Sequence, residues 1–180
     1  MNPPSTDSPV LDIGIIPLPE GGAIGMTRCP GKRPNEAVCA PRDVQADLVA
    51  LRDWGAETVV TLNQNRELTG LGVPDLGASV QAAGMRWVHL PIGDMAAPDR
   101  PWETGWGDVG PRIHQWLRAG ERVAFHCGGG QGRAGTIAAL TLIERGYTPD
   151  EAIQTVRKAR PGAIESPDQE RYLLNRPLPT

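Results

Sequence analysis

The pattern of apolar and polar positions divides the chain into short strand-like runs and longer helix-like segments. Apolar runs rich in strand-forming residues occupy positions 10–16, 22–26, 57–62, 86–90 and 123–127. Apolar residues spaced three or four apart, as on one face of a helix, occupy positions 41–53, 73–83, 113–117, 134–146, 149–159 and 166–174. Strands that alternate with helices usually pair in parallel. We therefore expect a three-layer α/β fold, with a mainly parallel central sheet flanked by helices.

Capping residues and prolines refine these boundaries. Thr148 and Ser166 each open a capping box with a proline at the first helical position, so we expect a helix to begin after each. Residues 91–106 hold several prolines and small residues and are predicted to form a loop. The polar, proline-rich residues 1–9 are predicted to be a disordered tail, and residues 10–180 a single domain.

One stretch, residues 123–136, combines a strand, a glycine-dense turn and the start of a helix. Cys127 lies where the apolar run ends, and Arg133 lies six residues later, where the helical pattern begins. Four of the five residues between them are glycines, which lets the backbone curl with successive N–H groups pointing inward. A helix N-terminus adds unpaired N–H groups and a partial positive charge, so this turn is predicted to bind an anion.

The two residues that bracket the turn supply chemistry suited to a phosphate group. A positive environment favours the thiolate, which is the nucleophilic form of cysteine, so Cys127 is the candidate nucleophile. The guanidinium of Arg133 presents a planar fork of donors that matches two phosphate oxygens. The pattern predicts phosphoryl transfer through a cysteinyl-phosphate. The predicted phosphate-binding residues are Gly128, Gly129, Gly130, Gln131, Gly132 and Arg133.

Two nucleotide-binding motifs compete for the same glycines. The spacing Gly130-x-Gly132-x-x-Gly135 formally fits the dinucleotide fingerprint, but the acidic residue expected about twenty positions later, after a second strand, is missing. Residues 149–160 are instead helical in pattern. The nucleotide P-loop requires lysine after its last glycine, where this chain has Arg133. A merely structural cysteine beside a glycine turn would leave Arg133 unexplained.

His126-Cys127-x5-Arg133 resembles the signature of the cysteine-dependent protein tyrosine and dual-specificity phosphatases. From about residue 22 to residue 174, the order of elements is similar to the kinase-associated phosphatase branch of that family. The other matching segments are Cys29-Pro30-Gly31, Pro91-Ile92-x-Asp94 with Pro98-Asp99, and Arg160-x-Gly162-Ala163-Ile164. The resemblance implies a phosphatase fold and the hydrolysis of a phosphoprotein or another phosphate monoester, without a metal or a cofactor.

The resemblance also implies the general acid. In that branch the aspartate after Pro-Ile protonates the leaving group, and this position is Asp94. Such an acid is needed on chemical grounds, because the departing alkoxide or phenoxide must receive a proton. Asp99 lies in the same proline-rich segment and is the rival candidate.

Two positions depart from the family pattern. The family usually has serine or threonine after the signature arginine, where its hydroxyl stabilises the departing thiolate, and this chain has Ala134. Thr136 could supply a hydroxyl, although from another direction on the helix. Tyrosine phosphatases position the hydrolytic water with a glutamine at the place of Glu165, and Gln169 could take over that role or serve only its capping box.

Composition limits the remaining possibilities. The chain has 180 residues and a net charge of −3, which argues against a general nucleic-acid-binding protein. No apolar run approaches the roughly 18 residues of a membrane span, and the N-terminus lacks a signal-peptide pattern, so we expect a cytoplasmic protein that does not bind membranes. An odd number of cysteines, three, agrees with a reducing compartment. We expect the protein to be a monomer.

The sequence favours a phosphate-monoester hydrolase and leaves two rivals. One is a pseudophosphatase module that binds phosphoproteins but turns over slowly because of Ala134 and Glu165. The other is sulfur transfer through a persulfide on Cys127. The signature loop contains no lysine, which argues mildly against highly charged phosphoinositide substrates. Phosphotyrosine, phosphoserine and phosphothreonine all remain open.

Overall fold

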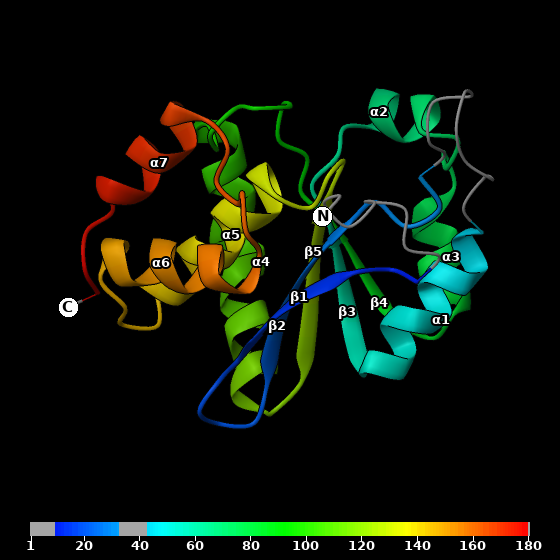
Figure 1. Ribbon diagram of the computed structural model, residues 1–180, viewed down its shortest axis with the longest axis horizontal. Coiled ribbons are helices and arrows are strands. Elements are labelled where there is room, and N and C mark those ends of the chain that lie inside the picture. Colours follow the sequence, from blue (N-terminus) through cyan, green and yellow to red (C-terminus); the bar gives the residue numbers. More distant parts are fainter. Residues whose placement is uncertain (1–9, 33–42, 180) are drawn as a thin grey trace, which may run out of the picture.

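A five-stranded sheet forms the centre of the computed structural model, which describes residues 10–32 and 43–179 (Figure 1). Its strand order is β1-β2-β5-β3-β4. The strands are β1 (Ile13–Pro17), β2 (Ala23–Arg28), β3 (Ala56–Thr61), β4 (Arg86–His89) and β5 (Arg122–Cys127). β1 runs antiparallel to β2, and all other neighbours are parallel. The mainly parallel sheet is therefore confirmed, while the tail proposed for residues 1–9 lies outside the described residues.

Helices cover both faces of this sheet and complete the three expected layers. In Figure 1, α1 and α3 lie on one side of the strands, and α4, α5 and α6 lie on the other. The helices of the described residues are α1 (Val44–Trp54), α2 (Asn65–Gly70), α3 (Leu76–Ala82), α4 (Arg100–Arg118), α5 (Gly132–Ile143), α6 (Pro149–Ala159) and α7 (Pro167–Leu174). Two buried apolar clusters, one on each face of the sheet, anchor these layers.

The central strand belongs to both clusters. Val123 and Phe125 of β5 pack in the larger cluster with α4 and α5, whereas Ala124 packs in the smaller one with α1 and α3. All three side chains are fully buried. This alternation follows from the two-residue period of a strand. Since β5 has neighbours on both edges and helices on both faces, the residues at its carboxyl end are held firmly in place.

The capping boxes predicted from the sequence are present. Thr148 accepts a hydrogen bond from the backbone of Glu151 at the start of α6, and Ser166 accepts one from the backbone of Gln169 at the start of α7. The helix expected over residues 41–53 begins at Val44, with Asp43 as its N-cap. The part of that prediction before residue 43 lies outside the described residues.

Two elements differ from the sequence-based expectation. The loop predicted over residues 91–106 is wrong beyond Asp99, because α4 begins at Arg100 and continues to Arg118. The prolines that suggested a loop are compatible with this helix, since Pro101 lies in its first turn, where no backbone N–H is required. The short helix α2 was not anticipated. No helix in the described part of the chain is both long and apolar enough to cross a membrane.

Candidate active site

Cys127 lies at the carboxyl end of the central strand β5. Open α/β folds bind their ligands beyond the carboxyl ends of the strands. Only 3% of the surface of Cys127 is exposed, and it lines a cavity of about 460 Å³. Five side chains selected from the sequence line this cavity: Cys127, Arg133, Asp94, Glu165 and Gln169. The structure therefore brings together groups that are up to 75 residues apart in the chain, from Asp94 to Gln169.

The carbonyl groups of the glycine turn are held from outside the cavity. The backbone N–H of Cys29 donates to the oxygen of Gly128 at 3.3 Å. Arg160 donates from Nη2 to Gly129 and from Nε to Gly130, each at 3.1 Å. Because the C=O and N–H of one peptide unit point in opposite directions, these contacts leave the N–H groups that follow free of the outer partners. This arrangement is compatible with the anion-binding nest predicted from the sequence, and anion binding stays a prediction.

Gly130 occupies a position where only glycine fits. Its φ is +75°, and a Cβ there would lie 2.3 Å from the backbone carbon of Thr27 on β2. The adjacent Gln131 points away from the turn, since its amide donates to the carbonyl of Pro161 at 3.2 Å. Gly130 and Gln131 are not among the residues that line the cavity. Their contribution to phosphate binding stays a prediction that concerns their backbone alone.

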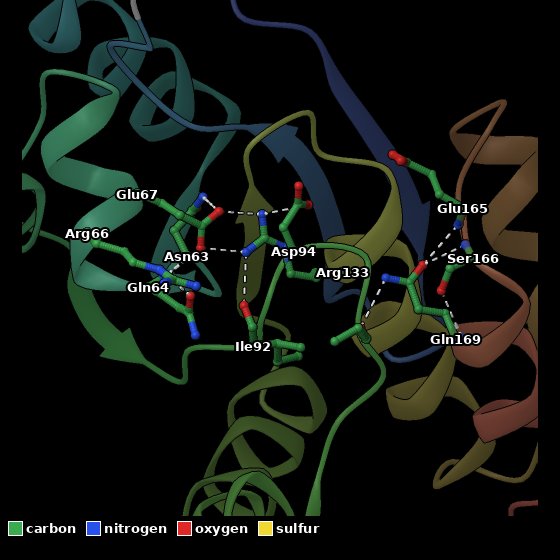
Figure 2. A network of polar contacts seen from close by, with 11 residues as sticks. Asn63, Gln64, Arg66, Glu67, Ile92, Asp94, Arg133, Glu165, Ser166 and Gln169 are labelled. Atoms are coloured by element: carbon green, nitrogen blue, oxygen red, sulfur yellow. Dashed lines mark hydrogen bonds and ion pairs between the residues drawn. The ribbon is translucent and has the colours of Figure 1, made fainter.

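Arg133 is buried beneath the cavity and uses four of its five donors (Figure 2). Nη1 donates to Oε2 of Glu67 at 2.8 Å and to the carbonyl of Ile92 at 2.9 Å. Nη2 donates to Oε1 of Glu67 at 2.8 Å and to Oδ1 of Asp94 at 3.3 Å. No hydrogen bond among the described residues uses Nε. A phosphate can therefore bind through Nε and Nη2 if Asp94 releases its contact.

Glu67 is a site residue that the sequence analysis missed. It is the third residue of α2, and its Oε2 also accepts from the backbone N–H of Gln64 at 2.7 Å. Burial acts to raise the pKa of this carboxyl, but the hydrogen bonds to Arg133 and Gln64 lower it below its ordinary value. The reciprocal interaction raises the pKa of Arg133 against the effect of burial. The spacing Gln64-x-x-Glu67, which fits a capping box, was the available signal.

The two candidate acids have different surroundings. Asp94 faces Arg133, and 75% of its side chain is exposed, so it can move toward a substrate. The following residue, Met95, has a φ of +59°, an uncommon conformation for a residue other than glycine. Asp99 instead caps α4, where its Oδ1 accepts from the backbone N–H of Trp102 at 2.9 Å. This geometry favours Asp94 as the acid and gives Asp99 a structural role.

The residues proposed to position water lie beside the turn. A Cβ on Gly132 would be 3.2 Å from the amide of Gln169 and 3.5 Å from the carboxyl carbon of Glu165. Figure 2 shows Gln169 joined to the backbone of Glu165 and Ser166. Its Oε1 accepts at 3.0 and 3.1 Å, and its Nε2 donates to Ala96 at 3.2 Å. Both oxygen lone pairs are therefore occupied, and one N–H remains for water.

Thr136, the candidate from the sequence, does not supply the hydroxyl that Ala134 lacks. Ala134 is fully buried at the start of α5, behind Cys127. Thr136 donates its only hydroxyl hydrogen to the carbonyl of Gly132, at 2.7 Å. That bond completes a turn of the helix and leaves the Thr136 hydroxyl without a hydrogen for the departing sulfur. The substitution of the family's serine or threonine by Ala134 is therefore not compensated by Thr136.

Cys29 lies near Cys127 but is chemically distinct from it. Burial raises the pKa of the Cys29 thiol to about 12, so it stays protonated at neutral pH. Cys29 and Cys127 are both free of disulfide bonds. Cys39 lies outside the described residues. Of the two described cysteines, only Cys127 lines the cavity.

Comparisons with known proteins agree with this geometry. Residues 36–147 match the model of a family described as "Polymorphic toxin system, DSP-PTPase phosphatase". The chain is 31% identical over 136 residues to mouse cyclin-dependent kinase inhibitor 3, covering 73% of this chain and 62% of that protein. It is 39% identical over 77 residues to human protein tyrosine phosphatase type IVA 3, covering 38% and 44% of the two chains.

Solved structures lead to the same family. Kinase associated phosphatase, crystallised with its catalytic cysteine replaced by serine, superposes with a TM-score of 0.79 at 26% identity, covering 91% of this chain and 92% of that one. The active form of Tk-PTP gives a TM-score of 0.65 at 28% identity, covering 86% and 92%.

The matches cover different shares of the proteins compared. The chain spans about 62% of the length of the curated kinase inhibitor 3 relatives that it matches. The family model, however, matches more than half of the chain and includes the signature from Cys127 to Arg133. The chain therefore belongs to the cysteine-dependent dual-specificity and tyrosine phosphatase family and is similar to the kinase-associated phosphatase branch.

Proposed function

We propose that this protein hydrolyses phosphate monoesters through a cysteinyl-phosphate on Cys127. The observation that carries this proposal is the turn between Cys127 and Arg133. Its carbonyls at Gly128, Gly129 and Gly130 accept hydrogen bonds from Cys29 and Arg160, which leaves its backbone N–H groups available to a phosphate in the cavity. That arrangement suits the three equatorial oxygens of a phosphoryl group. The nearby thiol of Cys127 supplies the nucleophile.

The free donors of Arg133 define how the phosphate binds. Substrate replaces Asp94 on Nη2 and pairs with Nε, which gives a two-point contact from the guanidinium. Glu67 and Ile92 hold Nη1 and keep the guanidinium plane fixed. Substrate binding thus frees the Asp94 carboxyl to reach the leaving-group oxygen.

The reaction has two steps with opposite proton transfers. In the first, the Cys127 sulfur attacks phosphorus, the bond from phosphorus to the ester oxygen breaks, and Asp94 gives its proton to that oxygen. In the second, water attacks phosphorus, the sulfur–phosphorus bond breaks, and Asp94 takes a proton from the water. The products are the dephosphorylated alcohol or phenol and inorganic phosphate.

The test is Cys127→Ser with an aryl phosphate substrate. The nest and Arg133 survive this change, so vanadate should still bind while turnover falls to below about one hundredth of the natural rate. Turnover above that level would end the covalent mechanism. If the natural protein transfers sulfur from thiosulfate to cyanide and does not hydrolyse the aryl phosphate, the persulfide alternative would be favoured.

A slow, phosphate-binding pseudophosphatase is the second candidate, favoured by Ala134 and by the engaged hydroxyl of Thr136. Without a donor to the departing sulfur, hydrolysis of the intermediate should limit the rate and produce a burst in rapid-quench experiments. One hydrogen bond to a charged group is worth about ten- to a hundredfold in rate, so Ala134→Ser should raise steady-state turnover by that factor. Absence of a burst together with unchanged turnover in Ala134→Ser would exclude this candidate.

Phosphoproteins are the proposed substrates, and the cytoplasm is the proposed compartment. Among the described residues, two cations line the cavity, Lys32 and Arg133, and three carboxylates do: Glu67, Asp94 and Glu165. This charge balance disfavours substrates with several phosphates. The chemistry requires a free thiol at Cys127, which a reducing compartment maintains. Comparing phosphopeptides with soluble phosphoinositides would identify the substrate class, and higher kcat/KM for the lipids would contradict the proposal.

A further inference from the structure

The side chain of Glu165 lies beside the phosphate-binding turn and is exposed to solvent. It lines the same cavity as Cys127, and its carboxyl carbon would be 3.5 Å from a Cβ on Gly132. In Figure 2 the carboxylate points away from Gln169, which contacts Glu165 only through the backbone N–H. Among the described residues, the Glu165 carboxylate makes no hydrogen bond and no ion pair.

The other two carboxylates of the cavity differ from Glu165, because both pair with Arg133. Glu67 receives a donor on each of its oxygens at 2.8 Å, and Asp94 accepts at 3.3 Å. Arg133 has no contact to spare for Glu165, since its remaining Nε donor is needed for the phosphate. In the part of the chain that the structure describes, no ion pair joins Glu165 to Lys32, the other cation of the cavity.

The arginines nearest to Glu165 in the sequence are engaged as well. Each donates to another carboxylate: Arg157 to Glu170 at 3.3 Å, Arg160 to Asp12 at 2.8 Å and Arg171 to Asp168 at 2.8 Å. Arg160 also holds carbonyls of the glycine turn. Within the described residues, the charge of Glu165 is therefore available to a cation that arrives with the substrate.

The backbone that carries Glu165 is fixed. The preceding residue, Ile164, has a φ of +61°, a strained conformation for a β-branched residue. The N–H of Ile164 donates to the carbonyl of Gln131 at 3.2 Å, and its carbonyl accepts from Arg157 at 3.1 Å. The N–H of Glu165 donates to Gln169 at 3.0 Å. Such strain persists only where the surrounding contacts maintain it, so the carboxylate is presented from a well-defined position.

A bound phosphate would make an unpaired carboxylate at this position unfavourable. Among the described residues that line the cavity, carboxylates already outnumber cations, and the phosphate brings further negative charge. Like charges at close range repel, and the repulsion grows where water is partly excluded. A positive side chain on the substrate would offset this repulsion and form an ion pair with Glu165.

We propose that Glu165 is a specificity residue that binds an arginine or lysine side chain next to the phosphorylated residue of a phosphopeptide. This role rests on the proposed function and differs from the water-positioning role considered from the sequence. It makes phosphopeptides with basic neighbours the preferred substrates. The preference depends on the charge of Glu165 and should disappear when that charge is removed.

The test compares peptides that differ only in the charge beside the phosphorylated residue. Two sets, one with phosphotyrosine and one with phosphothreonine, carry arginine, citrulline or glutamate on both sides of that residue. Citrulline has nearly the shape of arginine without its charge. In the set that is hydrolysed faster, kcat/KM of the natural protein should be about fivefold higher with arginine than with citrulline, the upper end for an exposed ion pair, and lowest with glutamate.

Two variants separate a direct contact from a general effect of charge. Glu165→Gln keeps the size of the side chain, and it should hydrolyse the arginine and citrulline peptides equally well. Asp168→Asn is the matched control, because it removes an exposed carboxylate three residues away that does not line the cavity. This control should keep the fivefold preference. Hydrolysis of an aryl phosphate, which carries no cation, should not fall in Glu165→Gln.

Equal kcat/KM for the arginine and citrulline peptides in the natural protein, or a preference that persists in Glu165→Gln, would overturn the inference. So would an equal loss in Glu165→Gln with every substrate, aryl phosphate included, which would indicate that Glu165 positions water. If no phosphate monoester is hydrolysed, the proposed function fails. The affinities of the natural protein for the same peptides, measured by calorimetry, then decide the inference by the same ratio, and a lack of binding to all of them would overturn it.

Discussion

At the scale of single residues, the site depends on the way that the donors of Arg133 are divided. Two donors pair with Glu67 and one with a backbone carbonyl, which leaves Nε and the Nη2 donor now on Asp94 for the phosphate. The carboxylate of Glu67 also lies close enough to neutralise part of the positive charge. Glu67 is therefore a positioning residue, and its contribution can be separated from that of Asp94.

Glu67→Gln should reduce kcat/KM by about ten- to a hundredfold. An amide presents one oxygen and two hydrogens to Arg133, so the paired contact with both carboxylate oxygens is lost, and a hydrogen bond to a charged group is worth about 1.5–3 kcal/mol. Kinetics with an aryl phosphate and vanadate binding would measure this loss. Glu57→Gln, on the exposed side of β3, is the control and should have natural activity. Natural activity in Glu67→Gln would show that Arg133 needs no carboxylate partner.

Substitution by asparagine should lower the activity at one candidate acid, Asp94, and leave it unchanged at the other, Asp99. Asp94→Asn cannot donate a proton, so kcat should fall most for substrates with poor leaving groups and least for activated aryl phosphates. Asparagine caps helices about as well as aspartate, so Asp99→Asn should leave α4 and the activity intact. A series of aryl phosphates with different leaving-group pKa values would measure both. A leaving-group dependence that steepens in Asp99→Asn, and not in Asp94→Asn, would exchange their roles.

At the scale of elements, the sequence predicted the helices and turns that are marked by residues close together in the chain. The turn after β5 was recognised from its glycines, and α6 and α7 from their capping boxes. The six-residue helix α2 buries only Leu68, so it has no apolar periodicity to reveal it. Glu67 was missed with it, because its partner Arg133 is 66 residues away in the sequence. Such pairs are set by tertiary structure, which no local pattern records.

The start of α4 was obscured by composition. Prolines and small residues between residues 91 and 106 suggested a loop. Asp99 followed by Pro101, with Trp102 and Trp106 four apart, is nevertheless a helix-start signal. The two indoles stack with centroids 5.2 Å apart and are buried against the core. Packing of this apolar face outweighs the low helix propensity of the glycines. The helix thereby fixes the end of the loop that carries Asp94.

Asp99→Ala should therefore destabilise the fold by about 1 kcal/mol, the usual effect of removing an N-cap. The loss should appear in urea unfolding as a lower midpoint with an unchanged slope. Asp108→Ala, at an exposed position within the same helix, is the matched control and should change stability by less than about 0.5 kcal/mol. Equal effects of the two substitutions would mean that the cap on α4 is not stabilising.

At the scale of the whole molecule, the proposed nucleophile Cys127 lies at the end of the central strand, which both layers of helices cover. The strand that carries Cys127 is enclosed by apolar clusters on both faces, and this enclosure takes His126 fully out of water. The cavity, in contrast, opens at the end of the sheet, where loops from several elements converge. The fold thus combines a rigid floor with walls from α2, the loop after β4 and the start of α7.

Burial of His126 makes the stability of the entire fold depend on pH. Its pKa falls from an ordinary value near 6.5 to about 3 in the folded protein, so between these values the unfolded chain binds one proton more. Stability is therefore fully present above about pH 6.5 and declines as the pH falls toward 3. From pH 7.5 to 5.5 the free energy of unfolding should drop by about 1.4 kcal/mol, which is the protonation free energy of one unfolded histidine. Urea unfolding at the two pH values would measure the drop, and His126→Asn should remove that part of it. An equal drop in the natural protein and in His126→Asn would show that His126 takes up its proton in the folded protein as readily as in the unfolded chain, contrary to the effect expected from its burial.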